Sequence, residues 1–560
     1  MKPEPTVRRF TLDDVLPAAL ALLALVIGVL VFWSFLRPYA MQVGFDEGYE
    51  AAGVERLLSG RGLPYVDMVS IRGPFLYWSL AIMHLLTGRF QWTGTRAIGL
   101  VCCMTMVSTS FLSGWAAGWP LAGAIAGALY VFVIGTYMDP GGAIGIHAEP
   151  IAIAYISTAF FLVSYALYRA RTPRRRLVLL VLGGALVAIG GLTKQTLALC
   201  CLPMLLWIVL HASVKVGETF EDGRPRWRPV LAGWALPFVA GGTGLVLLVL
   251  LRYALAGELK TFFFWSLGVS SQIYMEPFKG RVARLVMEWF MGEPWAIFGS
   301  ILALTVAFGP ALGRVTRPTL RAILAGFGES AFETVVGLMA LLLLLVAAIP
   351  LRIWGHYFLP IWVFFGMTVG ILVERFAVRR SAQPRLAQAL VVLVFGALLL
   401  PSGINRLNKL ANDRSHGAWP NPRPDAACAE IDRIAGPGRE EIFIWGLAGD
   451  LYITCQRRCA SMFTHTTVIA GIVPPFWNEP RANRVPPGSR EKLLAELTAR
   501  PPKVIIDHPI SIAGTAMMDF PMYASFINGR YCRVSSMEDR GKSLTFYGRN
   551  DLEVCRQRSP

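Results

Sequence analysis

Long apolar segments divide most of this chain into regular blocks. Eleven windows have about the 17 to 25 residues that a helix needs to cross a lipid bilayer, and none of them contains Asp, Glu, Lys or Arg. This pattern predicts a mainly α, polytopic membrane protein with about 11 transmembrane helices. The windows are Val15–Leu36, Ala97–Trp119, Pro120–Met138, Pro150–Tyr168, Leu177–Thr193, Gln195–His211, Pro229–Leu251, Pro294–Gly313, Thr334–Leu351, Tyr357–Val373 and Leu386–Ser402.

Two pairs of neighbouring windows are almost continuous. The gaps between them, at Trp119/Pro120 and around Lys194, are only a residue or so wide. Each pair is therefore expected to form either a tight helical hairpin or one broken element.

The first connecting loop, residues 37–93, is long and partly apolar. Asp46–Leu58 has the pattern of a helix that ends at Ser59-Gly60. Gly73–Thr87 is apolar but too short to cross a bilayer. We expect it to lie along the membrane interface as an amphipathic helix.

The pattern changes after residue 402, where helical and extended segments alternate. This alternation favours a small α/β domain at residues 403–560, following a membrane domain at residues 1–402. Predicted helices are Asp425–Ala435 and Glu491–Ala499, and predicted strands are Glu441–Trp445, Leu451–Cys455, Lys503–Asp507, Arg530–Val534 and Ser543–Tyr547.

Composition and charge support membrane insertion and indicate its direction. Only 16% of the 560 residues are charged, and mean hydropathy is +0.51. The net charge of +17 comes largely from arginines in short gaps between apolar windows, which indicates membrane orientation and argues against nucleic-acid binding. The gaps richest in Lys and Arg are cytoplasmic if the N-terminus is cytoplasmic. We therefore predict a bacterial inner-membrane protein whose C-terminal domain is periplasmic or extracellular.

The nine cysteines fall into two groups. Four lie in apolar windows, where they read as small core residues, and five lie in the tail: Cys428, Cys455, Cys459, Cys532 and Cys555. The odd number leaves at least one of the five unpaired, and the pairing stays open. Zinc is an alternative for Cys455 and Cys459, but no further His or Cys completes a finger-like site.

Ionisable groups at a membrane boundary are costly and therefore indicate a structural or functional role. The first loop holds the leading candidates for functional residues. Asp46-Glu47 either complements the dipole at a helix start or supplies a general base, with Glu47 as its partner or a metal ligand. Arg72 suits a phosphate by charge and bidentate geometry. Its alternative is a guanidinium that snorkels to the interface.

Three further places carry polar groups next to apolar windows. Lys194 either snorkels or meets a lipid phosphate. Asp139, His147 and Glu149, in a Gly-rich connection, could orient a sugar, bind a metal or form a polar cap. Arg352 could contact a phosphate, whereas Trp354 and Tyr357 fit an aromatic belt. In the derived topology all these places face outward, which suits an anionic amphipathic substrate.

The first-loop residues resemble those of the GT-C glycosyltransferases, in the bacterial branch related to protein O-mannosyltransferases and lipid A aminoarabinose transferase. The resemblance rests on Asp46-Glu47, Gly62–Asp67 and Arg72–Tyr77, with weaker similarity at Gly191–Thr196, His356–Pro360, Ile444–Gly446 and Pro501–Asp507. It covers most of the chain, and its first-loop pattern is the most specific part.

The resemblance implies an inverting sugar transfer from a polyprenyl-phosphate donor to a glycan, lipid or protein acceptor. Asp46 would activate the acceptor hydroxyl, and Arg72 and Lys194 would stabilise the leaving lipid phosphate. Tyr65, Asp67, His356 and Tyr357 are further substrate-binding candidates within the matching motifs.

Two positions depart from the family pattern. Arg72 stands where many relatives have Lys, and His356 stands where an Arg often precedes the Tyr. These departures change the geometry of one cation and make the other titratable. No cofactor is assigned, and a divalent metal ion is left open.

Two other functions compete with an enzyme. A transporter or flippase of lipid-linked sugars would favour inverted repeats and charges buried in mid-span, whereas these windows lack charges. A membrane-anchored assembly scaffold would not need Asp46.

Overall fold

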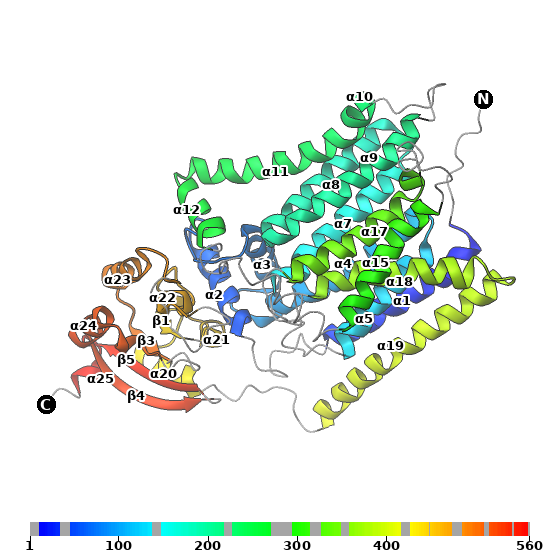
Figure 1. The fold of residues 1–560 in the computed structure, drawn as a ribbon. Coiled ribbons are helices and arrows are strands. Elements are labelled where there is room, and N and C mark those ends of the chain that lie inside the picture. Colours follow the sequence, from blue (N-terminus) through cyan, green and yellow to red (C-terminus); the bar gives the residue numbers. More distant parts are fainter. Residues whose placement is uncertain are drawn as a thin grey trace.

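A computed structural model of the protein describes most of the chain. The described residues are 10–33, 45–136, 147–217, 227–269, 294–313, 326–348, 358–415, 426–446, 448–472, 484–508, 515–539 and 542–557. They form a bundle of long helices and a smaller part built around a sheet (Figure 1). Eight helices in the described residues are long and apolar enough to cross a membrane, and five apolar helices are shorter. The mainly α membrane fold is therefore confirmed, whereas the number of eleven spans stays a prediction.

Each apolar window is helical, except at its ends, over the part that the structure describes. The bundle helices are α1 (Leu12–Trp33), α4 (Trp92–Ala117), α5 (Pro120–Thr136), α7 (Ala148–Tyr168), α8 (Pro173–Thr193), α9 (Cys201–Gly217), α10 (Trp227–Val230), α11 (Leu236–Leu255), α15 (Pro294–Leu312), α17 (Ala331–Ala348), α18 (Leu359–Val373) and α19 (Pro384–Ser415). Short π-helical turns, η2 (Leu231–Ala235) and η5 (Glu374–Val378), continue α10 and α18, and α12 (Leu259–Phe263) with η3 (Phe264–Val269) follows α11.

Both narrow gaps are resolved as tight connections. At the first, Gly118 ends α4 in the left-handed conformation with φ of 86°, and Pro120 opens α5. A proline is favourable there because the first helical amide has no partner in the helix. At the second, α8 ends at Thr193 and the 3-10 helix η1 (Gln195–Cys200) leads into α9.

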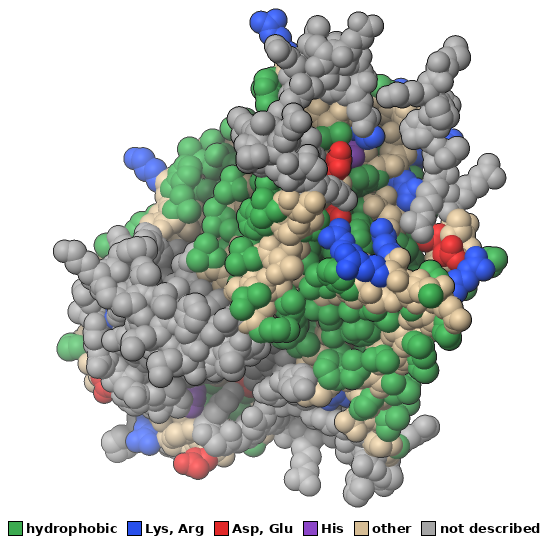
Figure 2. Space-filling view, turned by 45° about the vertical axis from the view of Figure 1, so that its right-hand side comes forward, with side chains coloured by type: hydrophobic (Ala, Val, Ile, Leu, Met, Phe, Trp, Pro, Cys, Tyr) green, Lys and Arg blue, Asp and Glu red, His purple; other side chains and the backbone are tan. Residues whose placement is uncertain are grey.

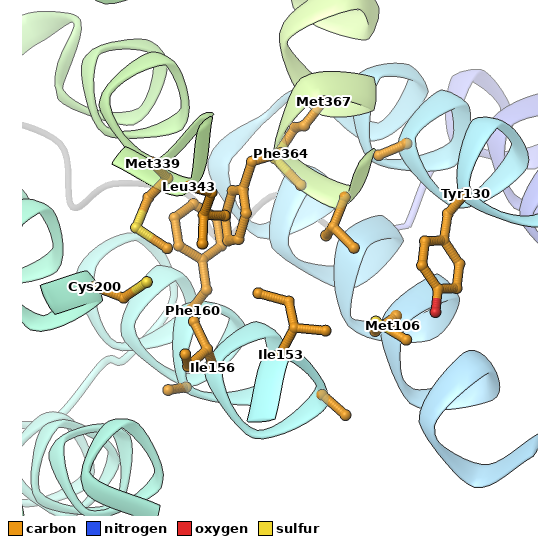
Figure 3. Close-up of a cluster of buried hydrophobic side chains, with 14 of the residues drawn as sticks. Met106, Tyr130, Ile153, Ile156, Phe160, Cys200, Met339, Leu343, Phe364 and Met367 are labelled. Atoms are coloured by element: carbon orange, nitrogen blue, oxygen red, sulfur yellow. The ribbon is translucent and has the colours of Figure 1, made fainter. Parts of the chain in front are cut away.

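Close-packed apolar side chains hold the bundle together. Figure 3 shows Phe160 of α7 between Met339 and Leu343 of α17 and Phe364 of α18. The ring of Phe160 stacks on Trp207 at 4.8 Å between centroids and meets Phe364 edge-on at 5.1 Å. A charge at these positions would lose its hydration without a partner, which explains why the windows carry none.

The first loop forms two helices between the bundle and the sheet. The predicted helix at Asp46–Leu58 is α2 (Phe45–Ser59), and the predicted interfacial helix is α3 (Pro74–Thr87). One face of α3 is buried, while Ile82, Leu85 and Leu86 are exposed. Apolar side chains therefore lie on both faces of α3, so the expected amphipathic pattern is not seen, and its interfacial position stays a prediction.

The C-terminal part is a five-stranded mixed sheet covered by short helices. The strand order is β2-β1-β3-β5-β4, with β1 parallel to β2 and β3, and β5 antiparallel to β3 and β4. The strands are β1 (Glu441–Trp445), β2 (Arg458–Cys459), β3 (Val504–Asp507), β4 (Tyr531–Asp539) and β5 (Lys542–Arg549); the helices are α20 (Ala426–Ala435), α21 (Asp450–Thr454), α22 (Thr467–Ala470), α23 (Ser489–Ala499), the 3-10 turn η7 (Met517–Asp519), α24 (Pro521–Arg530) and α25 (Glu553–Arg556).

Most tail elements match the prediction, but the predicted strand Leu451–Cys455 is wrong. This segment is the helix α21, and its Tyr452 hydroxyl accepts a hydrogen bond from the amide of Ile444 in β1. Tertiary packing on β1 thus overrides the extended preference of a short apolar run. The predicted domain boundary at residue 402 falls inside α19, and the division into two domains stays a prediction.

Two disulfides account for four of the five cysteines in the tail. Cys428 is bonded to Cys455, and Cys532 is bonded to Cys555. The zinc alternative for Cys455 and Cys459 is therefore wrong, because Cys455 has no thiol to offer a metal. Cys459 is a buried free thiol.

Contacts tie the sheet to the first loop. The hydroxyl of Tyr49 in α2 donates to the carbonyl of Gly446 at the end of β1, at 3.0 Å. Arg56 donates to the carbonyl of Cys459, at 2.9 Å, and the amide of Val69 donates to the carbonyl of Met462, also at 2.9 Å. Helix α2 is therefore held from two sides, by the bundle and by the sheet.

Candidate active site at one end of the bundle

The first turn of α2 brings the two leading carboxylates to the bundle. The backbone of Asp46 lies in this turn, and its side chain lies outside the described residues. Glu47 is buried and pairs with Arg96 of α4, with 2.8 Å between Oε1 and Nε. Removing either partner of a buried ion pair leaves an uncompensated charge. This pair therefore fixes the start of α2, and with it Asp46, against α4.

Arg72 is held beside the same helix. Its Nη1 atom lies 2.8 Å from Oε1 of Glu50 in α2, and both side chains are mostly buried. The hydroxyl of Tyr65 donates to the carbonyl of Arg72 at 2.6 Å. Arg72 is thus fixed by its side chain and by its backbone, which an interfacial, snorkelling Arg would not require.

A close backbone contact places Arg72 next to Lys194. The amide of Gly73 donates to the carbonyl of Thr193 at 3.2 Å. A Cβ atom at position 73 would lie 1.8 Å from the carbonyl oxygen of Leu192, so only glycine fits. Since Arg72 precedes Gly73 and Lys194 follows Thr193, the two cationic residues lie on adjoining backbone. This contact joins Gly73 and Thr193, which are more than a hundred residues apart in the sequence.

Lys194 pairs with the polar start of α7. Its Nζ atom lies 2.6 Å from Oε1 of Glu149, which is buried in the first turn of that helix. His147 is the N-cap residue of α7 and is also buried. Glu47, Arg72, His147, Glu149 and Lys194 therefore gather at one end of the bundle, which we term the site end.

A buried polar network braces α2 against α3 and α4. Both ring nitrogens of His84 are engaged, Nδ1 with Oε1 of Glu55 at 3.0 Å and Nε2 with the hydroxyl of Thr95 at 2.9 Å. Arg89 donates to the other carboxylate oxygen of Glu55 at 2.8 Å. Burial raises the pKa of Glu55, but hydrogen bonds from His84, the amide of Phe90 and Arg89 outweigh it, and the pKa is lowered.

Tyr65 and Asp67 shape the loop before Arg72. The carboxylate of Asp67 accepts hydrogen bonds from the amides of Arg61 and Leu63, at 3.0 and 2.8 Å. Tyr65 has a φ of 69°, which is uncommon for a non-glycine residue. Its ring is fully buried, and burial, with a smaller contribution from Tyr253, raises the pKa of its phenol. Both side chains therefore act on the loop conformation in this structure.

Four candidates lie outside the described residues: Asp139, Arg352, His356 and Tyr357. The described residues contain no group of three or more His, Cys, Asp or Glu that could hold a metal ion. Each described candidate carboxylate has an engaged oxygen, Glu47 with Arg96 and Glu149 with Lys194.

Sequence reasoning missed the partners of the candidates. Glu50, Arg96 and the set of Glu55, His84 and Arg89 were not singled out. Arg96 offered a signal, because a lone charge directly before the apolar window Ala97–Trp119 is costly without a partner. Glu50 offered another, since it follows Asp46 by one helical turn and shares its face.

The arrangement suits recognition of an anion at the end of a membrane bundle. Arg72 and Lys194 are each oriented by a buried carboxylate while keeping part of the side chain exposed, 19% and 24%. Preorganised cations stabilise negative charge that develops on a leaving group.

Comparison with known proteins gives structural neighbours only. No protein-family model matches the chain, and no curated protein matches its sequence. Among solved structures, ArnT from Cupriavidus metallidurans bound to undecaprenyl phosphate is 18% identical, with 95% of this chain and 97% of that chain covered, at a TM-score of 0.45. The oligosaccharyltransferase AglB from Archaeoglobus fulgidus, in complex with an inhibitory peptide and a dolichol-phosphate, is 12% identical, with coverage of 97% and 75%, at a TM-score of 0.45. The same archaeal enzyme in the apo form has a TM-score of 0.47. These neighbours are GT-C enzymes, the superfamily that the first loop resembles, but similarity at this level carries no activity over to this chain.

Proposed function

We propose that this protein is an inverting glycosyltransferase that moves a sugar from a polyprenyl-phosphate donor to an envelope glycan, lipid or protein. The observation that supports it best is the close contact of Gly73 with Leu192 and Thr193, which brings the backbone of Arg72 next to that of Lys194. An amphipathic donor needs its phosphate held at the end of a membrane bundle and its lipid in the bilayer.

In the proposed reaction, Asp46 accepts the proton of an acceptor hydroxyl. The hydroxyl oxygen attacks the anomeric carbon of the donor sugar, a new glycosidic bond forms, and the bond from this carbon to the phosphate oxygen breaks. The polyprenyl phosphate leaves with the bond electrons, and Arg72 and Lys194 stabilise its charge. Attack opposite the leaving group inverts the anomeric configuration.

Glu47, Tyr65 and Asp67 have supporting roles in this proposal. Glu47 holds the first turn of α2 through Arg96, Tyr65 holds the backbone of Arg72, and Asp67 orders the loop before it. Positioning of this kind contributes to catalysis because small displacements from reactive geometry are costly. Asp139, His147, Glu149, Arg352, His356 and Tyr357 remain proposed substrate-binding residues.

We also propose that the site end and the sheet face the periplasm or the cell exterior of a bacterial inner membrane. The two disulfides of the sheet region support this placement, because disulfides persist in oxidising compartments. The dense arginines of the opposite loops support a cytoplasmic N-terminus.

The test is transfer by the purified full-length protein in liposomes with polyprenyl-phosphate sugars. Asp46→Asn and Asp46→Ala should lower transfer by at least about a hundredfold, the usual contribution of a general base. Glu538→Gln, on the exposed side of β4, should transfer normally. Normal transfer by both folded Asp46 variants would contradict the assignment of the base. Movement of an intact donor across the bilayer without any transfer would show a flippase instead.

A further inference from the structure

A cavity lies at the end of the bundle opposite the candidate active site, which we term the distal end. Its walls come from the start of α1, the turn between α4 and α5, the end of η5 and the start of α19. Its volume is about 870 Å³, within the range of about 300–1,000 Å³ typical of small-ligand sites. Its lining shares no residue with the site end.

Two arginines line the cavity, and each of them pairs with a carboxylate of the same lining. The guanidinium of Arg379 lies over the ring of Trp119 at 3.7 Å and donates to the carbonyl of Gly118 at 2.6 Å. It also pairs with Glu374 at 2.7 Å. Arg385 pairs with Asp13 at 3.1 Å, and its side chain is 80% exposed. Both guanidiniums therefore reach the cavity while partly open to solvent.

The carboxylates at the cavity are less available than the arginines. Glu374 is buried, and its second oxygen accepts a hydrogen bond from the amide of Ala122 at 3.1 Å. Glu374 therefore interacts both with Arg379 and with the start of α5, and it is much less exposed than Arg379. The side chain of Asp13 is 56% exposed and faces the more exposed Arg385. Gln383 and Gln388 add neutral polar groups to the lining.

Apolar side chains extend from the cavity along the outer surface of the bundle. Leu12 of α1 and Leu386, Leu390 and Leu393 of α19 are all more than half exposed. Only 22% of the apolar window of α19 is buried. Lys and Arg side chains gather above a broad apolar surface on the face shown in Figure 2. A polar cavity bordered by exposed leucines matches a molecule with a charged head and apolar chains.

We propose that this cavity binds the phosphate headgroup of an anionic phospholipid from the leaflet at the distal end. Arg379 and Arg385 pair with the phosphate through guanidinium hydrogen bonds, and the acyl chains lie along α1 and α19. Basic pockets between transmembrane helices are a known mode of anionic lipid recognition. The site is separate from sugar transfer, so it does not depend on the proposed enzymatic function.

The experiment is native mass spectrometry of the full-length protein in detergent, with phosphatidylglycerol or phosphatidylcholine of the same acyl chains. The wild-type protein should retain phosphatidylglycerol preferentially. R379Q/R385Q should lower that retention by about tenfold, the effect of losing a charge-assisted hydrogen bond. R174Q is the matched control, because Arg174 is exposed at the distal end and outside the cavity.

The R379Q/R385Q variant could fold poorly, because Arg379 also donates to the turn between α4 and α5. The single variant R385Q keeps this contact and therefore serves as a second test. Equal retention of the two lipids by the wild-type protein would overturn the proposal. So would phosphatidylglycerol retention by R385Q equal to that of the wild-type protein and R174Q. Displacement of the bound lipid by millimolar inorganic phosphate would assign the cavity to a soluble anion instead.

Discussion

The two ends of the helix bundle are best compared through one ion pair at each end, Glu47 with Arg96 and Asp13 with Arg385. At the site end, Glu47 and Arg96 are almost fully buried, and Glu50 and Glu149 are buried beneath their cations. At the distal end, Glu374 is likewise buried beneath Arg379, but the pair of Asp13 and Arg385 is largely exposed. Buried pairs carry a desolvation cost that stability alone does not repay, whereas exposed pairs contribute little. The difference predicts that the pair of Glu47 and Arg96 contributes far more to stability and to the position of α2 than the pair of Asp13 and Arg385 contributes at the distal end.

The largest expected effect comes from breaking the most buried pair. Glu47→Gln leaves Arg96 without its carboxylate and should lower the free energy of unfolding by about 3–5 kcal/mol. Thermal unfolding in detergent measures this loss. The double variant Glu47→Leu/Arg96→Met should recover much of the stability without recovering transfer. Recovery of transfer by the double variant would show that the pair does not position Asp46.

The next effect comes from the contact that joins Arg72 to Lys194. Gly73→Ala inserts a methyl group against the carbonyl of Leu192 and should cost about 1–3 kcal/mol by overpacking. It should also reduce transfer by separating the two cations. Gly244→Ala is the matched control, because a Cβ atom there would meet nothing within 4 Å. Equal transfer by both folded variants would remove the strongest support for the proposed function.

A smaller effect concerns acid stability at the site end. The pKa of Glu55 is lowered in the folded state, so its contribution to stability is complete above the unfolded value of 4.5. That contribution is lost as the pH falls through the lower, folded value. Glu55→Gln should therefore be less stable at pH 7 by about 1–3 kcal/mol, and the difference from the wild-type protein should shrink in acid. A difference that is constant from pH 3 to pH 7 would contradict this assignment.

The smallest effect is expected at the exposed distal pair. Asp13→Asn should change the free energy of unfolding by less than about 1 kcal/mol and should leave transfer unchanged. Raising the salt concentration should reduce the small difference further. A loss as large as that of Glu47→Gln would erase the contrast between the two ends.

The sequence predicted the elements of the site better than their partners. Asp46–Leu58 and Gly73–Thr87 were predicted as helices, and the structure has α2 and α3 there. The pairing of Glu50 with Arg72 was not predictable, because it depends on how a loop folds back onto a helix. The segment of α21 was predicted as a strand because the local sequence does not reveal that Tyr452 packs on β1.

What the sequence by itself determined is the kind of molecule and the places where polar groups interrupt apolar segments. Bilayer thickness and the cost of burying a charge constrain each segment separately. The apolar segments and their polar interruptions can therefore be recognised from the local sequence pattern alone. The tertiary structure decided which of those polar groups meet. The absence of a side chain at Gly73 lets α3 reach the end of α8, and Arg72 thereby comes beside Lys194. Contacts between distant segments depend on the packing of the whole bundle, which no single segment encodes.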